Sequence, residues 1–108
     1  MNTKTIKYFL AICEKGSFTK AAAANGISQP SLSLAIQRLE SELGGALFHR
    51  NAHGVALTEL GSNLRPIFTT LVRCADEAGA MAAAGNVPFN NSRRRAASNF
   101  MRLRLQEL

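Results

Sequence analysis

The chain has 108 residues, a mass of 11.6 kDa and a formal net charge of +6, with 46% apolar and 19% charged residues. These values exclude a multidomain enzyme and a wholly disordered chain within these residues, and the basic surplus favours a polyanionic partner such as nucleic acid or anionic lipid. The charge is uneven, because residues 1–85 hold eight Lys/Arg and six Asp/Glu, whereas residues 86–108 hold five Arg and one Glu.

Several classes of site have no support in the sequence. No secretory signal is evident and no apolar run approaches membrane-spanning length, so no membrane partner is expected. Cys13 and Cys74 lie far apart and are expected to be reduced thiols, while His49 and His53 alone cannot make a metal site. Without a phosphate-cradling glycine loop or a nucleophile–base pair, we expect no cofactor and no enzyme activity.

Two helices are predicted near the N-terminus. Asn2 or Thr3 can cap the first helix and Gly16 ends it. A short second helix follows over residues 18–24, and Asn25-Gly26 is a strong stop signal. The first helix buries an apolar face with helical spacing, formed by Ile6, Phe9, Leu10 and Cys13.

A third helix and a hairpin follow. Ser28 can cap the third helix, a proline is tolerated in its first turn, and Gly44-Gly45 ends it. Leu47-Phe48 and residues 55–57 flank the polar turn 50–54 and predict a small β-hairpin. The buried stripe of the third helix is Leu32, Ile36, Leu39 and Leu43.

A long helix is predicted from about Glu59 to about Ala84, with Thr58 as its cap and Glu59 as an acidic residue in its first turn. Pro66 should kink it or mark where its first turns end. At 1.5 Å per residue it would span roughly 40 Å, more than the small head could cover, so a partner helix and a homodimer are expected. The predicted dimer seam is Leu60, Leu64, Ile67, Leu71, Cys74, Ala78 and Met81, widened by Phe68, Val72 and Ala75.

The order of these elements predicts a mainly α fold, a winged helix-turn-helix followed by a long dimerisation helix. The third helix begins with small, hydrogen-bonding side chains that can pair with base edges or phosphates, and Gln29 can bond adenine bidentately. Free N–H groups at its start attract phosphate. Gln37 and Arg38 could follow the DNA backbone, while Arg50 and His53 could reach the minor groove. The alternative is a simple helix cap with a solvated face.

Residues 1 to about 85 resemble the N-terminal DNA-binding domain and linker helix of LysR-type transcriptional regulators. The resemblance implies a bacterial cytoplasmic regulator that binds interrupted palindromic sites in double-stranded DNA as a homodimer or tetramer. It is carried by Tyr8-Phe9, Gly16–Thr19 with Ala21-Ala22, Ile27–Ser33, Ile36, Leu39-Glu40, Leu43-Gly44, Leu47-Phe48 with Arg50, Leu57-Thr58 with Gly61, and Pro66. The DNA contacts that it implies are Ser28, Gln29, Pro30, Ser31, Ser33, Gln37, Arg38, Arg50 and His53.

Three positions depart from the family pattern. Asn25 replaces the usual Leu, so a core contact under the turn is expected to be lost. Leu34 replaces a frequent Arg or Gln, which makes that DNA contact absent or apolar, such as a contact with a thymine methyl group. His53 replaces Arg or Lys, so the wing is expected to hold the minor groove less firmly near neutral pH.

The expected domains are a winged helix-turn-helix over 1–58, a linker and dimerisation helix over 59–85, and a basic segment over 86–108. Residues 90–92 can cap a last basic helix from Arg93, whose run Arg93–Arg95 is a solvated charge run by default, with DNA phosphate binding as the alternative. Because family members continue into an effector-binding domain, we expect a fragment without a small-molecule effector site. A short regulator acting as a dimerising, dominant-negative interaction module is the alternative.

Overall fold

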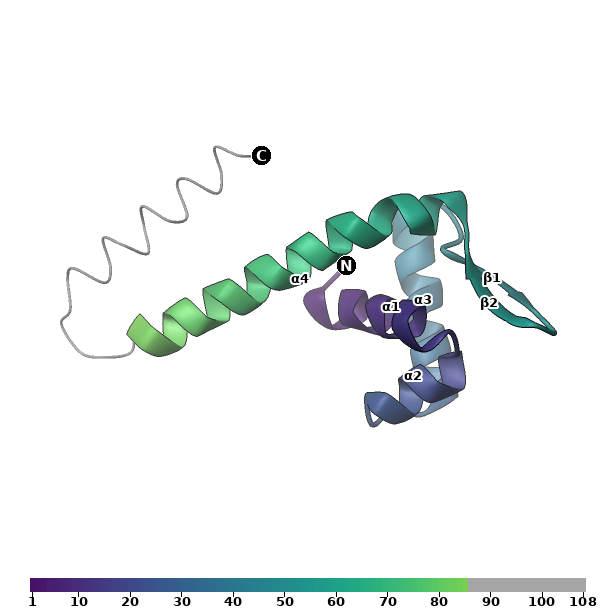
Figure 1. Ribbon diagram of the computed structural model, residues 1–108, viewed down its shortest axis with the longest axis horizontal. Helices are drawn as coiled ribbons and strands as arrows, with labels where there is room; N and C mark the ends of the chain where they lie inside the picture. Colours follow the sequence, from purple (N-terminus) through teal and green to yellow (C-terminus); the bar gives the residue numbers. More distant parts are fainter. Residues whose placement is uncertain (86–108) are drawn as a thin grey trace. The chain divides into compact units, whose positions relative to one another are not determined.

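The computed structural model describes residues 1–85, which form four helices and one two-stranded sheet in the order α1, α2, α3, β1, β2, α4 (Figure 1). The chain divides into two compact units, Met1–Arg73 and Cys74–Leu108. The first unit contains the helix-turn-helix, the hairpin and the first part of α4. The helix predicted from Arg93 onward lies outside the described residues.

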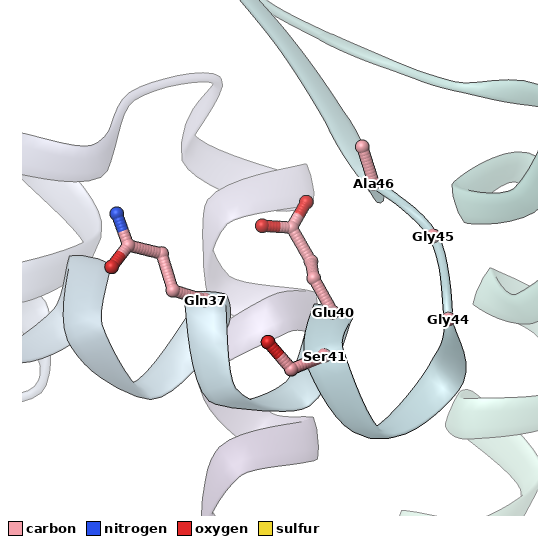
Figure 2. A pocket seen from close by; sticks show the side chains of 6 residues that line it. All are labelled: Gln37, Glu40, Ser41, Gly44, Gly45 and Ala46. Atoms are coloured by element: carbon pink, nitrogen blue, oxygen red, sulfur yellow. The ribbon is translucent and has the colours of Figure 1, made fainter.

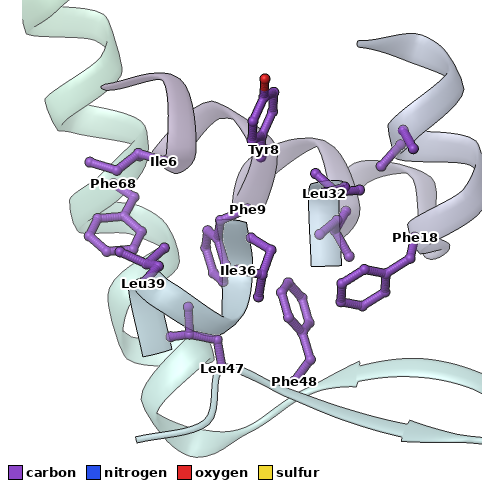
Figure 3. Close-up of a cluster of buried hydrophobic side chains, with 13 residues drawn as sticks. Ile6, Tyr8, Phe9, Phe18, Leu32, Ile36, Leu39, Leu47, Phe48 and Phe68 are labelled. Atoms are coloured by element: carbon purple, nitrogen blue, oxygen red, sulfur yellow. The ribbon is translucent and has the colours of Figure 1, made fainter. Parts of the chain in front are cut away.

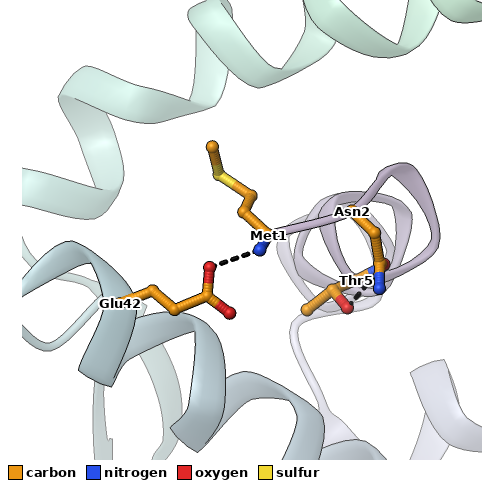
Figure 4. Close-up of polar contacts among 4 residues, drawn as sticks. All are labelled: Met1, Asn2, Thr5 and Glu42. Carbon is orange, nitrogen blue, oxygen red and sulfur yellow. Dashed lines mark hydrogen bonds and ion pairs between the residues drawn. The ribbon is translucent and has the colours of Figure 1, made fainter.

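Helix α1 spans Thr3–Lys15 and begins as predicted, because the side chain of Asn2 accepts a hydrogen bond from the Thr5 N–H at 2.8 Å. Figure 4 shows Asn2 with Thr5, whose hydroxyl also donates to Asn2 Oδ1 at 2.8 Å, and a second contact, in which the α-amino group of Met1 pairs with the Glu42 carboxylate. Both partners of this pair are substantially exposed, so it adds little stability. It does connect the start of α1 with the end of the third helix.

Helix α2 spans Phe18–Ala24, and the Ser17 side chain caps it by accepting a hydrogen bond from the Lys20 N–H at 3.1 Å. Asn25 ends the helix, and Gly26 follows with a φ of 66°, a left-handed conformation that favours glycine. The tight turn that the sequence predicts between the second and third helices is therefore confirmed.

Helix α3 spans Gln29–Leu43, with Ser28 as its N-cap and Gly44 at its C-terminal end. Strands β1 (Phe48–Asn51) and β2 (Gly54–Leu57) then form an antiparallel hairpin in which Asn51 pairs with Gly54. The turn is tighter than the predicted polar stretch 50–54, because β1 includes Arg50 and Asn51 and only two residues connect the strands. Figure 1 shows this wing projecting beyond the three helices.

Helix α4 spans Glu59–Gly85, close to the predicted bounds. Thr58 caps it, accepting a hydrogen bond from the Gly61 N–H at 3.0 Å, and Glu59 supplies the first-turn acid. Pro66 lies inside the helix, which does not end there. The second alternative drawn from the sequence, in which Pro66 marks the end of the first turns, is therefore wrong.

The core of the first unit lies where α1, α2 and α3 pack on one another and on the base of the wing (Figure 3). Four phenylalanine rings connect these elements: Phe9 packs against Phe48 and Phe68 at centroid distances of 5.2 and 5.3 Å, and Phe18 meets Phe48 at 5.5 Å. The buried members are Ile6, Tyr8, Phe9, Ile12, Phe18, Ala21, Ala22, Leu32, Ile36, Leu39, Leu47, Phe48 and Phe68.

Phe68 corrects one expectation. The sequence pattern placed it on the edge of the dimer seam, yet its side chain is only 2% exposed and its ring meets Phe9 edge to face. The first part of α4 therefore completes the core of the head. Because Phe68 lies four residues after Leu64, which also packs against this core, the two positions share a helix face.

Candidate nucleic-acid interface

The start of α3 presents the polar side chains that the sequence singled out. Ser28, Pro30 and Ser31 are exposed, and Gln29 and Ser33 are half-buried. The buried stripe of α3 faces the core through Leu32, Ile36 and Leu39, and the polar side chains at the start of the helix lie outside this stripe. These side chains are small hydrogen-bond donors and acceptors, which suits close approach to the edges of bases.

The helix cap uses part of this hydrogen-bonding capacity. Ser28 Oγ accepts a hydrogen bond from the Ser31 N–H at 3.2 Å and donates one to Ser31 Oγ at 2.8 Å. The Leu32 N–H is bound to the Ser28 carbonyl, and Pro30 has no N–H to offer. The expected cluster of free N–H groups for phosphate is therefore reduced to at most those of Ser28 and Gln29.

Gln29, Ser33 and Arg50 form one connected group. Gln29 Nε2 donates to Ser33 Oγ at 2.8 Å, one helical turn along α3. Arg50, on β1, donates from Nη2 to the same oxygen at 3.4 Å, and its Cζ atom lies 3.5 Å from the centroid of the Phe18 ring. The structure thus links Gln29 and Ser33, two of the predicted DNA-contacting residues of α3, to Arg50 of the wing.

The tip of the wing carries His53, which is exposed. Its backbone N–H donates to Asn51 Oδ1 at 2.8 Å, which stabilises the two-residue turn. The described residues thus place Arg50 and His53 on the same hairpin but at different points, with Arg50 near α3 and His53 at the end of the loop. His53 as a contact to the minor groove stays a prediction.

Further along α3, Gln37 and Arg38 are exposed and line a shallow hollow of about 470 Å³ with Leu34, Ser41 and Glu42. Leu34 is 47% exposed, so its apolar surface is open to solvent. Contact between Leu34 and a thymine methyl group stays a prediction. Gln37 and Arg38, the helix positions one turn after Leu34, are polar.

A second hollow, of about 500 Å³, lies at the C-terminal end of α3 and is drawn in Figure 2. Its lining includes Glu40, whose Oε2 accepts a hydrogen bond from the Leu47 N–H at 2.6 Å. The Glu40 carbonyl accepts two more, from the N–H groups of Gly44 and Gly45. Glu40 therefore holds the connection between α3 and the wing, a role that helical spacing alone did not reveal.

Asn25, one of the departures, is exposed, and its side chain donates from Nδ2 to the Ala21 carbonyl at 2.8 Å. It supplies a polar cap at the end of α2 where the family pattern has an apolar residue. The expected loss of an apolar core contact at this position stays a prediction.

Other kinds of site find no support in residues 1–85. No cluster of three or more His, Cys, Asp or Glu side chains there could hold a metal ion, and no helix there is long and apolar enough to span a bilayer. Both cysteines are free and partly exposed. Burial raises the pKa of the Cys13 thiol above its ordinary value, despite the nearby charge of Arg65, so the thiol is protonated and poorly nucleophilic at neutral pH.

The predicted dimer seam divides into groups of different exposure. Leu60 and Leu64 are half-buried against the core of their own head. Ile67 and Leu71 are 54% and 45% exposed and form an apolar pair one turn apart. The remaining members belong to the second compact unit, where Ala78 is exposed while Cys74 and Met81 are half-buried.

Comparison with known proteins agrees with this geometry. The family described as "Bacterial regulatory helix-turn-helix protein, lysR family" matches residues 3–62, more than half of the chain. The chain belongs to the LysR family. The resemblance drawn from the sequence and the predicted winged helix-turn-helix fold are both confirmed.

Curated LysR-family relatives match the N-terminal part of the chain. The HTH-type transcriptional regulator BudR of Klebsiella aerogenes is 51% identical over 61 residues, which cover 56% of this chain and 43% of that protein. TfdT of Cupriavidus pinatubonensis is 48% identical over 61 residues, covering 56% of this chain and 27% of that protein. The chain thus spans less than half the length of these relatives.

Solved LysR-family structures superpose on most of the described residues. The DNA-binding domain of BenM in complex with catB site 1 DNA has a TM-score of 0.74 and 37% identity, covering 78% of this chain and 94% of that one. The DNA-binding domain of CbnR in complex with DNA has a TM-score of 0.73 and 31% identity, covering 78% of this chain and 97% of that one.

Proposed function

We propose that this chain is the DNA-binding part of a bacterial transcriptional regulator that recognises palindromic promoter sites as a dimer. The observation that carries the proposal is the start of α3, where Gln29 and its serine neighbours stand on an outer face beside an exposed wing. Two solved relatives of the same fold are complexes with DNA. Because promoter DNA is the proposed ligand, we also place the protein in the cytoplasm and regard it as a regulator, not an enzyme.

Within this proposal, α3 enters the major groove with its N-terminal residues against the base edges. Ser28, Pro30 and Ser31 approach the backbone and bases, Gln29 reads adenine, and Gln37 with Arg38 follows the phosphates. The wing carries His53 toward the adjacent minor groove. The exposures of these side chains are compatible with these contacts.

The dimer is proposed to form along α4 through Ile67 and Leu71. These two side chains are among the most exposed large apolar residues in the described part of the chain. They occupy seam positions of the heptad pattern, at a spacing of four residues. Leu60 and Leu64 contribute less to the dimer in this proposal, because their side chains already pack on the core of their own head.

Replacing Gln29 with Ala is expected to weaken binding to the specific duplex by about 1–3 kcal/mol and to leave nonspecific binding nearly unchanged, because only base reading is lost. The specific duplex is first selected by the wild type from fragments of the source genome. Fluorescence anisotropy titrations then compare the selected and scrambled duplexes at one fixed salt concentration. Equal losses on both duplexes would exclude base reading by Gln29.

A further inference from the structure

Arg50 occupies a position from which one side chain reaches three elements. It lies on β1, two residues after the buried Phe48, and alternation along the strand places both side chains on the same face of the hairpin. From there its guanidinium lies over the Phe18 ring of α2, and Nη2 donates to Ser33 Oγ on α3. This links the wing to both helices of the helix-turn-helix.

Two packed aromatic rings lie under Arg50. Phe18 is buried, and its ring packs edge to face against Phe48 of the same strand as Arg50. A planar guanidinium can stack on such a ring and keep N–H groups at its edge for hydrogen bonds, whereas the compact ammonium of lysine cannot hold both contacts. In this position the guanidinium directs its Nη2 toward Ser33 of α3.

Ser33 receives two hydrogen bonds at one oxygen, from Gln29 Nε2 at 2.8 Å and from Arg50 Nη2 at 3.4 Å. A hydroxyl oxygen has two acceptor positions, so both are used within the protein. The bond from Gln29 uses one of its two amide protons. The other proton and the carbonyl oxygen remain for a bidentate contact with adenine, now with the amide plane fixed by Ser33.

We propose that Ser33 and Arg50 are positioning residues that fix the reading amide of Gln29 and the angle of the wing, and that Arg50 does not neutralise a DNA phosphate. This inference rests on the proposed function. It revises the role that the sequence suggested for Arg50 and Ser33, which was direct contact with DNA. In the revised account the wing helps to orient the base-reading side chain through Ser33.

The test uses the full chain with Arg50→Lys, Ser33→Ala and the double variant, with Arg50→Gln to remove the charge, and with Arg73→Lys as a matched control on an exposed arginine of α4. Without DNA, NMR follows the side-chain amide signals of Gln29. With DNA, titrations on the selected and scrambled duplexes over a range of salt concentrations give the specificity ratio and the salt slope. Thermal unfolding checks that each variant is folded.

We expect the Gln29 amide signals to shift in Arg50→Lys and Ser33→Ala but not in Arg73→Lys. Each single variant should lose about tenfold in specific affinity, with an unchanged salt slope, and the double variant should lose little more because the two act through one contact. If the Gln29 signals do not move, the inference is wrong. It is also wrong if Arg50→Lys binds like the wild type while Arg50→Gln lowers the salt slope by about 0.9, the value for one lost phosphate contact.

The NMR measurement without DNA and the titrations with DNA distinguish failure of this inference from failure of the proposed function. If the Gln29 signals shift but the wild type binds selected and scrambled duplexes equally, the proposed function fails, and the claim that these residues position a DNA-reading group fails with it. If the wild type shows sequence specificity but the variants keep it in full, only the positioning role is overturned.

Discussion

Replacing Leu71 with Asp is expected to convert the dimer into monomers and to lower affinity for the two-half-site duplex by about 100-fold or more. Leu71 is 45% exposed and stands at the centre of the proposed seam with Ile67. A buried, unpaired carboxylate at a helix–helix contact opposes association. Loss of the partner removes the second half-site contact, and linked sites contribute a factor of about 10²–10⁴. Sedimentation and anisotropy titrations measure the two effects.

The control for this variant is Thr69→Asp. Thr69 is exposed on the same helix. Because it lies two residues before Leu71, its side chain is on a different face of the helix. The Thr69→Asp variant carries the same added charge as Leu71→Asp, so we expect it to remain a dimer and to lose only a little DNA affinity. The seam is refuted if wild-type protein sediments as a monomer at concentrations where it binds the duplex tightly, or if both variants behave alike.

Replacing Gly61 with Ala is expected to destabilise the fold by about 3 kcal/mol, because the head leaves no room for a methyl group there. A Cβ at Gly61 would lie 2.3 Å from the carbonyl oxygen of Leu47 and 2.9 Å from Leu57 Cδ2. That carbonyl already accepts a hydrogen bond from the Thr58 N–H at 3.0 Å, so the backbone cannot move away cheaply. Chemical denaturation measures the loss in the free energy of unfolding.

Gly79→Ala is the matched control, because Gly79 lies in the same helix and a Cβ there meets nothing within 4 Å. This change should leave stability unchanged or raise it by up to about 1 kcal/mol, since alanine is the better helix former. If Gly61→Ala is as stable as the wild type, the close approach between α4 and Leu47 does not exist in solution.

Much of the fold was predictable from the sequence because its signals are local. The side chains of Asn2, Ser17 and Ser28 cap the three helices of the head through hydrogen bonds to N–H groups three residues ahead; Gly16 and Gly44 end the first and third helices, and Asn25 ends the second. The hairpin follows from a turn between two short apolar stretches. These features depend on neighbours within a few residues, so one sequence suffices to find them.

The contacts that organise the site were not predictable in the same way. Arg50 and Phe18 are 32 positions apart, and Glu40 holds Leu47 across a turn, so no spacing rule connects them. The heptad pattern along α4 likewise could not separate the residues that pack on the head from those left for a partner helix. Phe68, for example, packs on Phe9 of α1. Periodicity identifies an apolar face but not the surface that covers it.

Net charge was the weakest guide to function. Residues 1–85, which contain the whole matched region, hold only two more basic than acidic residues, and the side chains at the start of α3 are mostly uncharged. The arginine-rich run Arg93–Arg95 lies outside the described residues and outside the family match. The proposed specificity therefore depends on side-chain placement, whereas the basic excess bears on salt-dependent, nonspecific affinity.

The most direct test of base reading by α3 replaces single adenines of the selected duplex with 7-deazaadenine, which lacks the N7 acceptor and keeps base pairing. At one adenine in each half-site the wild type should lose about 1–3 kcal/mol of binding free energy, and Gln29→Ala should lose nothing further there. If every adenine can be replaced without loss, or if Gln29→Ala shows the same losses as the wild type, Gln29 does not read adenine and the account is contradicted.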